Sequence, residues 1–158
     1  MDSSEICEAL SRVLLQRGWM LATAESCTGG MIAARCTDQA GSSQWFERGF
    51  VSYSNDAKSE LLGVPPELIA QHGAVSEAVA GAMASGAVQH ARAQVSVAVT
   101  GIAGPAGGSP DKPVGTVWFG WSVDSVVSTE RCVFGGDRAA VREATVQHAL
   151  QGLLKRLA

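Results

Sequence analysis

The chain lacks long hydrophobic runs and any cluster of basic residues. No apolar stretch approaches the roughly 20 residues that span a bilayer, so we expect no membrane partner. The 12 lysines and arginines are scattered along a chain of net charge −3, which leaves no basic face for nucleic acid. The amino end, Met1 to Glu5, is acidic and unlike a secretory signal, so we expect a cytoplasmic protein.

The cysteines and histidines also lack the spacings of metal sites. The four cysteines contain no C-x-x-C pair, and a chain of 158 residues does not need disulfides to fold, which predicts free thiols. His72, His90 and His148 are isolated from one another, and none lies at helical spacing from a cysteine or carboxylate that would form a metal-ligand motif. We therefore expect no metal and no other cofactor.

The composition is that of one globular domain spanning residues 1–158, with 46% hydrophobic and 17% charged residues. Helices are expected at residues 3–17, 29–37, 55–62, 76–91 and 137–157, and strands at 19–25, 45–53, 95–99, 114–123 and 125–134. Early parallel crossovers followed by a late hairpin predict a three-layer α/β/α sandwich with a mixed β-sheet. The glycine spacing does not fit the G-x-G-x-x-G of a Rossmann half.

Two loops follow predicted strands and point to one site. Residues 24–30, Ala-Glu-Ser-Cys-Thr-Gly-Gly, join a strand to a helix, whose first turn offers unpaired N–H groups. Residues 100–108 follow the β-branched run 95–99, and their glycines let a ligand approach the backbone. Ligands of open α/β sheets bind beyond the carboxyl ends of strands, so the two loops predict a shared site.

Ser26 is the leading candidate for a nucleophile. Taken alone, a serine at such a junction is more often a helix cap or turn residue. Here Thr28, Gly29 and Gly30 would supply backbone donors for a developing oxyanion. The sequence has no G-x-S-x-G elbow and no evident His–Asp partner for the serine. Cys27 is a rival nucleophile, although a small buried thiol is the commoner role for such a residue.

The best candidate for a base is Lys58, which needs a lowered pKa for that role. The alternative is a solvated lysine paired with a nearby carboxylate. Tyr53, the only tyrosine, is either core filler or a hydroxyl relay beside Lys58. Ser43 is another hydroxyl that could face the cleft. Arg138 lies in a first helical turn, where a cation is unfavourable, so it is either an anion ligand or one half of an exposed ion pair.

Seven motifs taken together resemble the C-terminal domain of the competence/damage-inducible protein A family, known as nicotinamide-nucleotide amidase. Any one motif is weak, but they occur in family order along nearly the whole chain. They are residues 24–30, 41–43 with 45–50, 53–55 with Lys58, 72–77, 100–105, 112–117 and 136–138.

The resemblance implies a hydrolase that converts nicotinamide mononucleotide to nicotinate mononucleotide and ammonia, in pyridine nucleotide recycling. It implies catalytic roles for Ser26, Tyr53 and Lys58, and a homo-oligomer. A non-catalytic phosphate- or nucleotide-binding module and a thiol amidase that uses Cys27 remain as alternatives. The expected substrate-binding residues are Thr28, Gly29, Gly30, Ser43, Thr100, Gly101, Ala103, Gly104 and Arg138.

Overall fold

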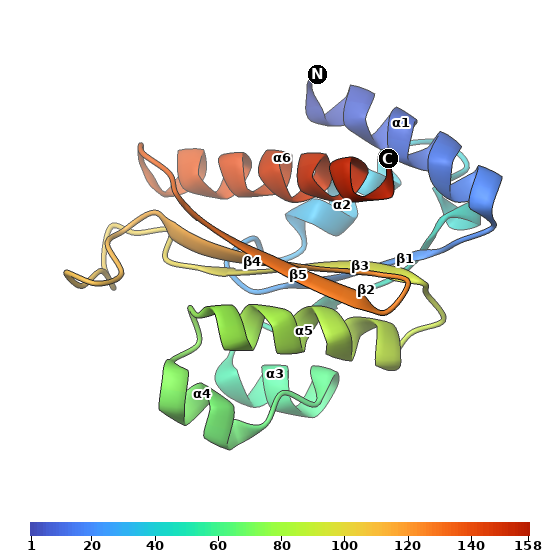
Figure 1. Cartoon of the computed structure of the whole chain (residues 1–158). Coiled ribbons are helices and arrows are strands. Elements are labelled where there is room, and N and C mark those ends of the chain that lie inside the picture. Colours follow the sequence, from blue (N-terminus) through green and yellow to red (C-terminus); the bar gives the residue numbers. More distant parts are fainter.

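A mixed sheet of five strands lies between two layers of helices in the computed structural model, which describes residues 1–158 (Figure 1). Helices α1, α2 and α6 cover one face of the sheet, and α3, α4 and α5 cover the other. This confirms the predicted three-layer α/β sandwich with a mixed sheet. The strands are β1 (Leu21–Glu25), β2 (Phe46–Val51), β3 (Val95–Gly101), β4 (Thr116–Val123) and β5 (Val126–Val133). The α-helices are α1 (Ser3–Arg17), α2 (Met31–Thr37), α3 (Asn55–Leu62), α4 (Pro66–His72), α5 (Glu77–Gln89) and α6 (Arg138–Leu157).

The strand order β2-β1-β3-β4-β5 brings three parallel strands together. Strands β2 and β3 both pair with β1 in parallel, so the chain leaves all three at one edge of the sheet. Strands β4 and β5 form the expected antiparallel hairpin. Its turn residues, Asp124 and Ser125, both have positive φ, as a two-residue turn of type I′ requires. The parallel edge therefore determines where the loops after Glu25, Val51 and Gly101 meet.

Local capping explains most helix boundaries. Asp2 and Glu5 form a capping box at α1, and Gly18 ends this helix with φ 67°. The Ser76 hydroxyl accepts from Val79 N–H at the start of α5, as its position predicted. No helix is both long and apolar enough to cross a membrane.

Two predicted boundaries and one unpredicted helix are the main differences between the predicted elements and the structure. Helix α2 begins at Met31 rather than Gly29, because Gly29 and Gly30 both have positive φ and form the turn before the helix. The second strand is shorter than the predicted 45–53, since Trp45 ends a 3₁₀ turn and is buried in the core. Helix α4 was not predicted. It begins with Pro66 in its first turn, where the missing N–H costs nothing.

The two faces of the sheet pack against side chains of different size. Along β3, Val95, Val97 and Val99 face α1, α2 and α6, where the larger core cluster lies. The opposite face carries small residues such as Ala98 and Gly120, which pack against α5. A β-carbon at Gly120 would lie 2.4 Å from the Ala80 carbonyl oxygen of α5. Small residues on this face therefore let α5 approach the sheet closely.

The Gly120→Ala variant is expected to be destabilised because its methyl group would meet the backbone of α5. A contact with helix backbone cannot be relieved by rotating a side chain, so α5 must move from the sheet, at a cost of about 1–3 kcal/mol. Gly135→Ala is the matched control, because nothing lies within 4 Å of a β-carbon at Gly135. Denaturant unfolding of both variants tests this; equal stabilities would show that α5 does not depend on the close approach.

Candidate active site

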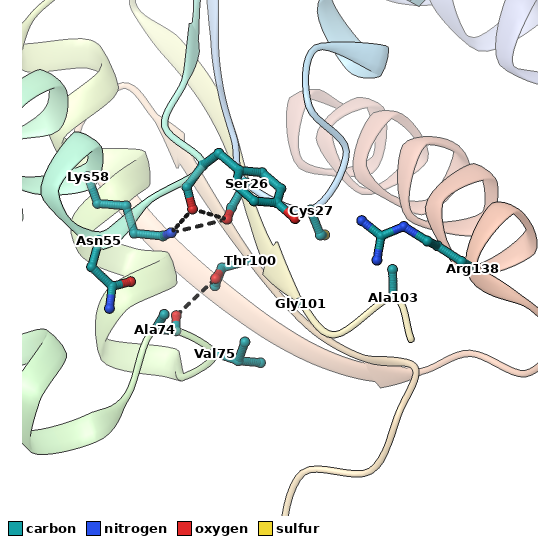
Figure 2. Close-up of a pocket in the computed structure, with 11 residues that line it drawn as sticks. Ser26, Cys27, Asn55, Lys58, Ala74, Val75, Thr100, Gly101, Ala103 and Arg138 are labelled. Atoms are coloured by element: carbon teal, nitrogen blue, oxygen red, sulfur yellow. Dashed lines mark hydrogen bonds between the residues drawn. The ribbon is translucent and has the colours of Figure 1, made fainter. Parts of the chain in front are cut away.

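A cavity of about 200 Å³ lies at the edge where the three parallel strands end (Figure 2). The loops after β1, β2 and β3 contribute to it, together with α3 and the first turn of α6. Lys58 and Arg138 approach from opposite sides, with Ser26 and Cys27 between them. The lining residues are Ser26, Cys27, Tyr53, Asn55, Lys58, Ala74, Val75, Thr100, Gly101, Ala103 and Arg138.

Ser26 and Lys58 are in direct contact. The Lys58 Nζ lies 3.1 Å from the Ser26 Oγ and 3.0 Å from the Tyr53 carbonyl oxygen. The Ser26 hydroxyl also donates to that carbonyl, at 3.3 Å. Tyr53 therefore reaches the pair through its main chain, and no hydrogen bond joins its phenol to Lys58. The phenol relay considered from the sequence is absent from this arrangement, and the Tyr53 side chain is exposed at the rim.

Lys58 is buried and has no carboxylate partner. Lys58 is 1% exposed, and it takes part in no ion pair. Burial lowers the pKa of its ammonium, because moving a charge out of water favours the neutral amine. The alternative of a solvated lysine paired with Asp or Glu is therefore wrong. A lysine with a lowered pKa, in contact with a serine hydroxyl, is positioned to take its proton.

Cys27 lies beside Ser26 but is poorly suited to be the nucleophile. Burial raises the pKa of its thiol to about 11, so the reactive thiolate is scarce at neutral pH. Arg142 of α6 donates to the Cys27 carbonyl at 3.1 Å and to the Thr28 carbonyl at 3.3 Å. The side chain of Arg142 thereby fixes the turn from α6, which lies in the same helix layer as α2. No sequence motif identified Arg142, because its role depends on how α6 packs.

The amino end of α2 is occupied by a carboxylate of the chain itself. Glu25 is buried, and its oxygens accept from the Thr28 hydroxyl at 2.6 Å and from the N–H groups of Ile32 and Ala33. The Gly29 N–H donates to the Ser26 carbonyl instead of facing the cavity. Thr28, Gly29 and Gly30 do not line the cavity in this chain, so they shape the turn rather than contact a ligand there.

The second loop enters the cavity as expected for most of its residues. Thr100, Gly101 and Ala103 line the cavity, and the Thr100 hydroxyl donates to the Ala74 carbonyl at 2.9 Å. Gly104 lies just outside, where its carbonyl accepts from the Arg138 guanidinium at 3.0 Å. Arg138 thus points into the cavity and is not paired with a carboxylate. The lining contains two basic and no acidic side chains, a polarity that suits an anionic ligand.

Ser43 does not reach this cavity. It lies in the 3₁₀ turn Ser42–Gln44 just before β2, and therefore near the amino end of that strand. The loops that form the cavity follow the carboxyl ends of parallel strands, so a residue before β2 lies toward the opposite edge. Asn55, Ala74 and Val75 line the cavity without having been predicted as site residues. Of these three, only Asn55 could have been predicted as a site residue from the sequence, because it lies between Tyr53 and Lys58.

Fold and site together define an α/β sandwich protein with a serine–lysine pair in a cationic cavity. The chain belongs to the CinA C-terminal domain family, whose sequence profile matches residues 3–157. It is 53% identical over 150 residues to nicotinamide-nucleotide amidohydrolase PncC of Escherichia coli K12, covering 94% of this chain and 91% of that protein. A nicotinamide-nucleotide amidohydrolase PncC of Pseudomonas putida is 57% identical over 133 residues, covering 84% and 83%.

A solved structure has the same fold. The competence damage-inducible protein A from Klebsiella pneumoniae superposes with a TM-score of 0.96 at 41% identity. The match covers 99% of this chain and 98% of that one. The family resemblance predicted from the sequence motifs is confirmed.

Replacing Lys58 by Met is expected to change how stability depends on pH. Burial lowers the pKa of Lys58 in the folded chain below the ordinary 10.5, so the unfolded chain binds more protons between these two values. The free energy of unfolding of the unmodified chain should therefore rise with pH across that window, relative to Lys58→Met. Denaturant unfolding from neutral pH to 10.5 measures the difference. Lys155→Met, which removes an exposed lysine, is the control; parallel curves for unmodified chain and Lys58→Met would contradict the account.

Proposed function

We propose that this chain is a nicotinamide-nucleotide amidase that hydrolyses the carboxamide of nicotinamide mononucleotide, in pyridine nucleotide recycling. The products are nicotinate mononucleotide and ammonia. The observation that carries the proposal is the buried Lys58 Nζ, 3.1 Å from the Ser26 Oγ, in a cavity lined by no acidic side chain. The names of the relatives support this substrate, and the contact between Ser26 and Lys58 supports their roles as nucleophile and base.

In the first half of the reaction, the Ser26 Oγ attacks the carboxamide carbon while neutral Lys58 takes the hydroxyl proton. The Tyr53 carbonyl holds Nζ and Oγ together, which orients both groups before the substrate arrives. The lysine ammonium then gives its proton to the departing nitrogen, which leaves as ammonia. An ester between Ser26 and the nicotinate carboxyl group remains. Because the base must be neutral, we expect the rate to rise with pH through the lowered pKa of Lys58.

The second half is hydrolysis of that ester, with Lys58 as the base for the attacking water. In both halves negative charge develops on the carbonyl oxygen of the substrate, and preorganised N–H donors stabilise it. The N–H groups of Cys27 and Thr28 donate to no backbone carbonyl, whereas those of Ser26 and Gly29 do. We assign the oxyanion contact to the Cys27 N–H, because Cys27 lines the cavity and Thr28 does not. Arg142 keeps the carbonyls of both residues turned toward α6.

The cavity holds only part of the substrate. Its volume of about 200 Å³ is below the roughly 300–1,000 Å³ of pockets that enclose drug-sized ligands. The nicotinamide ring therefore fits beside Ser26, and the ribose phosphate extends along the residues 101–104 toward Arg138. The Tyr53 ring, exposed at the rim, offers an aromatic face to the pyridinium cation. One guanidinium nitrogen of Arg138 already donates to Gly104, which fixes the rest of the group for the phosphate.

Ser26→Ala is expected to lower kcat for ammonia release from nicotinamide mononucleotide by about a thousandfold or more, because the covalent route is lost. Cys27→Ser is the matched control and should keep most of the activity. A coupled ammonia assay on the purified chain measures both. Reversal of the two results would support the thiol amidase. Absence of ammonia release from the unmodified chain would instead support a binding module without turnover.

Arg138→Ala is expected to weaken turnover of the mononucleotide much more than turnover of nicotinamide riboside, which lacks the phosphate. Loss of one charge-assisted contact costs about 1.5–3 kcal/mol, or roughly tenfold to a hundredfold in kcat/KM. Comparing kcat/KM for both substrates in both proteins tests the assignment. If both substrates lose equally, Arg138 supports the loop through Gly104 and does not bind phosphate.

A further inference from the structure

Three side chains with metal-binding atoms meet on the far side of the sheet from α5, and none of them lines the Ser26 cavity. Glu130 and Cys132 alternate along the edge strand β5, so both point to the same face. His148 of α6 packs over that face. The Glu130 Oε1, Cys132 Sγ and His148 Nε2 all lie within 4.8 Å of one another. His148 lies 16 positions after Cys132 in the sequence, so only the fold brings the three together.

The distances between these atoms fit one small metal ion. The Cys132 Sγ lies 3.5 Å from the His148 Nε2 and 3.6 Å from the Glu130 Oε1. Tetrahedral zinc, with bonds of about 2.3 Å to sulfur and 2.0–2.1 Å to nitrogen or oxygen, sets these pairs about 3.5–3.6 Å apart. His148 and Glu130 now share a short hydrogen bond. They would have to separate to about 3.3 Å, which a rotation of the half-exposed Glu130 side chain supplies.

The imidazole of His148 is already oriented by its neighbours. Its ring lies 4.6 Å from the Phe119 ring, 6.0 Å from Phe134 and 6.3 Å from Trp121. These contacts leave Nε2 directed at Cys132 and Glu130. A ligand set that is held before the metal arrives loses less conformational entropy on binding. The side chains of His148 and Glu130 are 33% and 43% exposed, so an ion can enter from solvent.

Two basic residues, Lys155 and Arg156, lie close to the cluster. The guanidinium of Arg156 already has partners of its own. The Arg156 guanidinium sits 3.7 Å from the centre of the Trp121 ring and donates to the Ser128 hydroxyl and the Gly152 carbonyl. These contacts hold Arg156 beside the cluster rather than in it. Lys155 lines a surface depression together with Glu130 and His148, and it is exposed, so its side chain can turn into solvent.

We propose that Glu130, Cys132 and His148 bind one Zn²⁺ ion, with water in a fourth position. A thiolate and an imidazole select zinc over magnesium or calcium, which prefer oxygen ligands alone. Binding releases the thiol proton to solvent, because zinc is held by the thiolate, and His148 binds the ion through an Nε2 that carries no proton. The ion joins the edge strand β5 to α6, and its role is to fix that strand against the helix. The site is independent of the amidase proposal, because none of its ligands lines the cavity.

The test is titration of the purified full chain with Co²⁺, which reports its ligands by absorption. We expect a single Co²⁺ per chain, a thiolate-to-cobalt charge-transfer band and the visible bands of four-coordinate cobalt, all removed when Zn²⁺ displaces the weaker ion. Cys132→Ser should abolish the charge-transfer band. His148→Gln and Glu130→Gln should each weaken binding by more than the roughly tenfold to hundredfold lost with an outer-shell partner.

The controls are Cys27→Ser and His72→Gln, which remove a cysteine and a histidine elsewhere and should leave the band unchanged. Saturating Zn²⁺ should also raise the Tm of the unmodified chain by roughly 5 °C or more, and that of Cys132→Ser by much less. No cobalt band in the unmodified chain would overturn the proposal. A band that persists in Cys132→Ser, or that disappears in Cys27→Ser, would also overturn it.

Discussion

A buried carboxylate at the start of α2 fixes the turn that holds the candidate nucleophile. Glu25 is the last residue of β1, yet its oxygens accept from Thr28 and from two N–H groups of the helix that follows. A buried charge is tolerated only when such hydrogen bonds replace water, and the positive end of the helix adds to them. The strand end and the helix start are thereby joined, with Ser26 and Cys27 between them at the mouth of the cavity. The same contact fills the amino end of α2, where an external anion would otherwise find free N–H groups.

Lys58 differs from Glu25 because it is a buried basic group, and no opposite charge lies beside it. Its ammonium contacts a hydroxyl and a carbonyl only, and burial lowers its pKa. A carboxylate at this position would stabilise the ammonium and leave it a poor base. Burying this amine without an acidic partner therefore costs the chain some stability at neutral pH. Perturbed titratable groups in a cavity are typical of functional sites, and here the perturbation has a geometric cause.

Local signals were enough to predict much of this fold and part of its site. Caps such as Asp2 and Ser76, and the turn at Asp124, each act through neighbours within a few residues, so the sequence reveals them. The meeting of Ser26 with residues 100–103 also followed, because parallel strands bring their carboxyl ends to one edge. The contact between Ser26 and Lys58 was a hypothesis that the motifs of the family supported.

Other features depend on packing between distant elements and had no local signal. Arg142 reaches the turn at Cys27 only because α6 crosses above it, and Glu130, Cys132 and His148 meet only across a strand and a helix. Linear spacing between histidines and cysteines therefore gave no indication of a metal cluster. Thr28, Gly29 and Gly30 were predicted to bind the ligand. No local signal indicated that the Glu25 carboxylate would occupy the amino end of the helix that follows them. Ser43 was predicted as a site residue from its motif alone. The strand order was not considered, and it puts Ser43 at the edge of the sheet away from the cavity.

Trapping the covalent intermediate tests whether Ser26 is the nucleophile. The chain would be mixed with nicotinamide mononucleotide, quenched in acid within the first turnovers and digested for mass spectrometry. If Ser26 forms the acyl-enzyme, the peptide containing Ser26 gains the mass of nicotinate mononucleotide less one water, with fragment ions that place it on the serine oxygen. An adduct on the adjacent Cys27, or ammonia release with no adduct on either residue at any quench time, would contradict this role of Ser26.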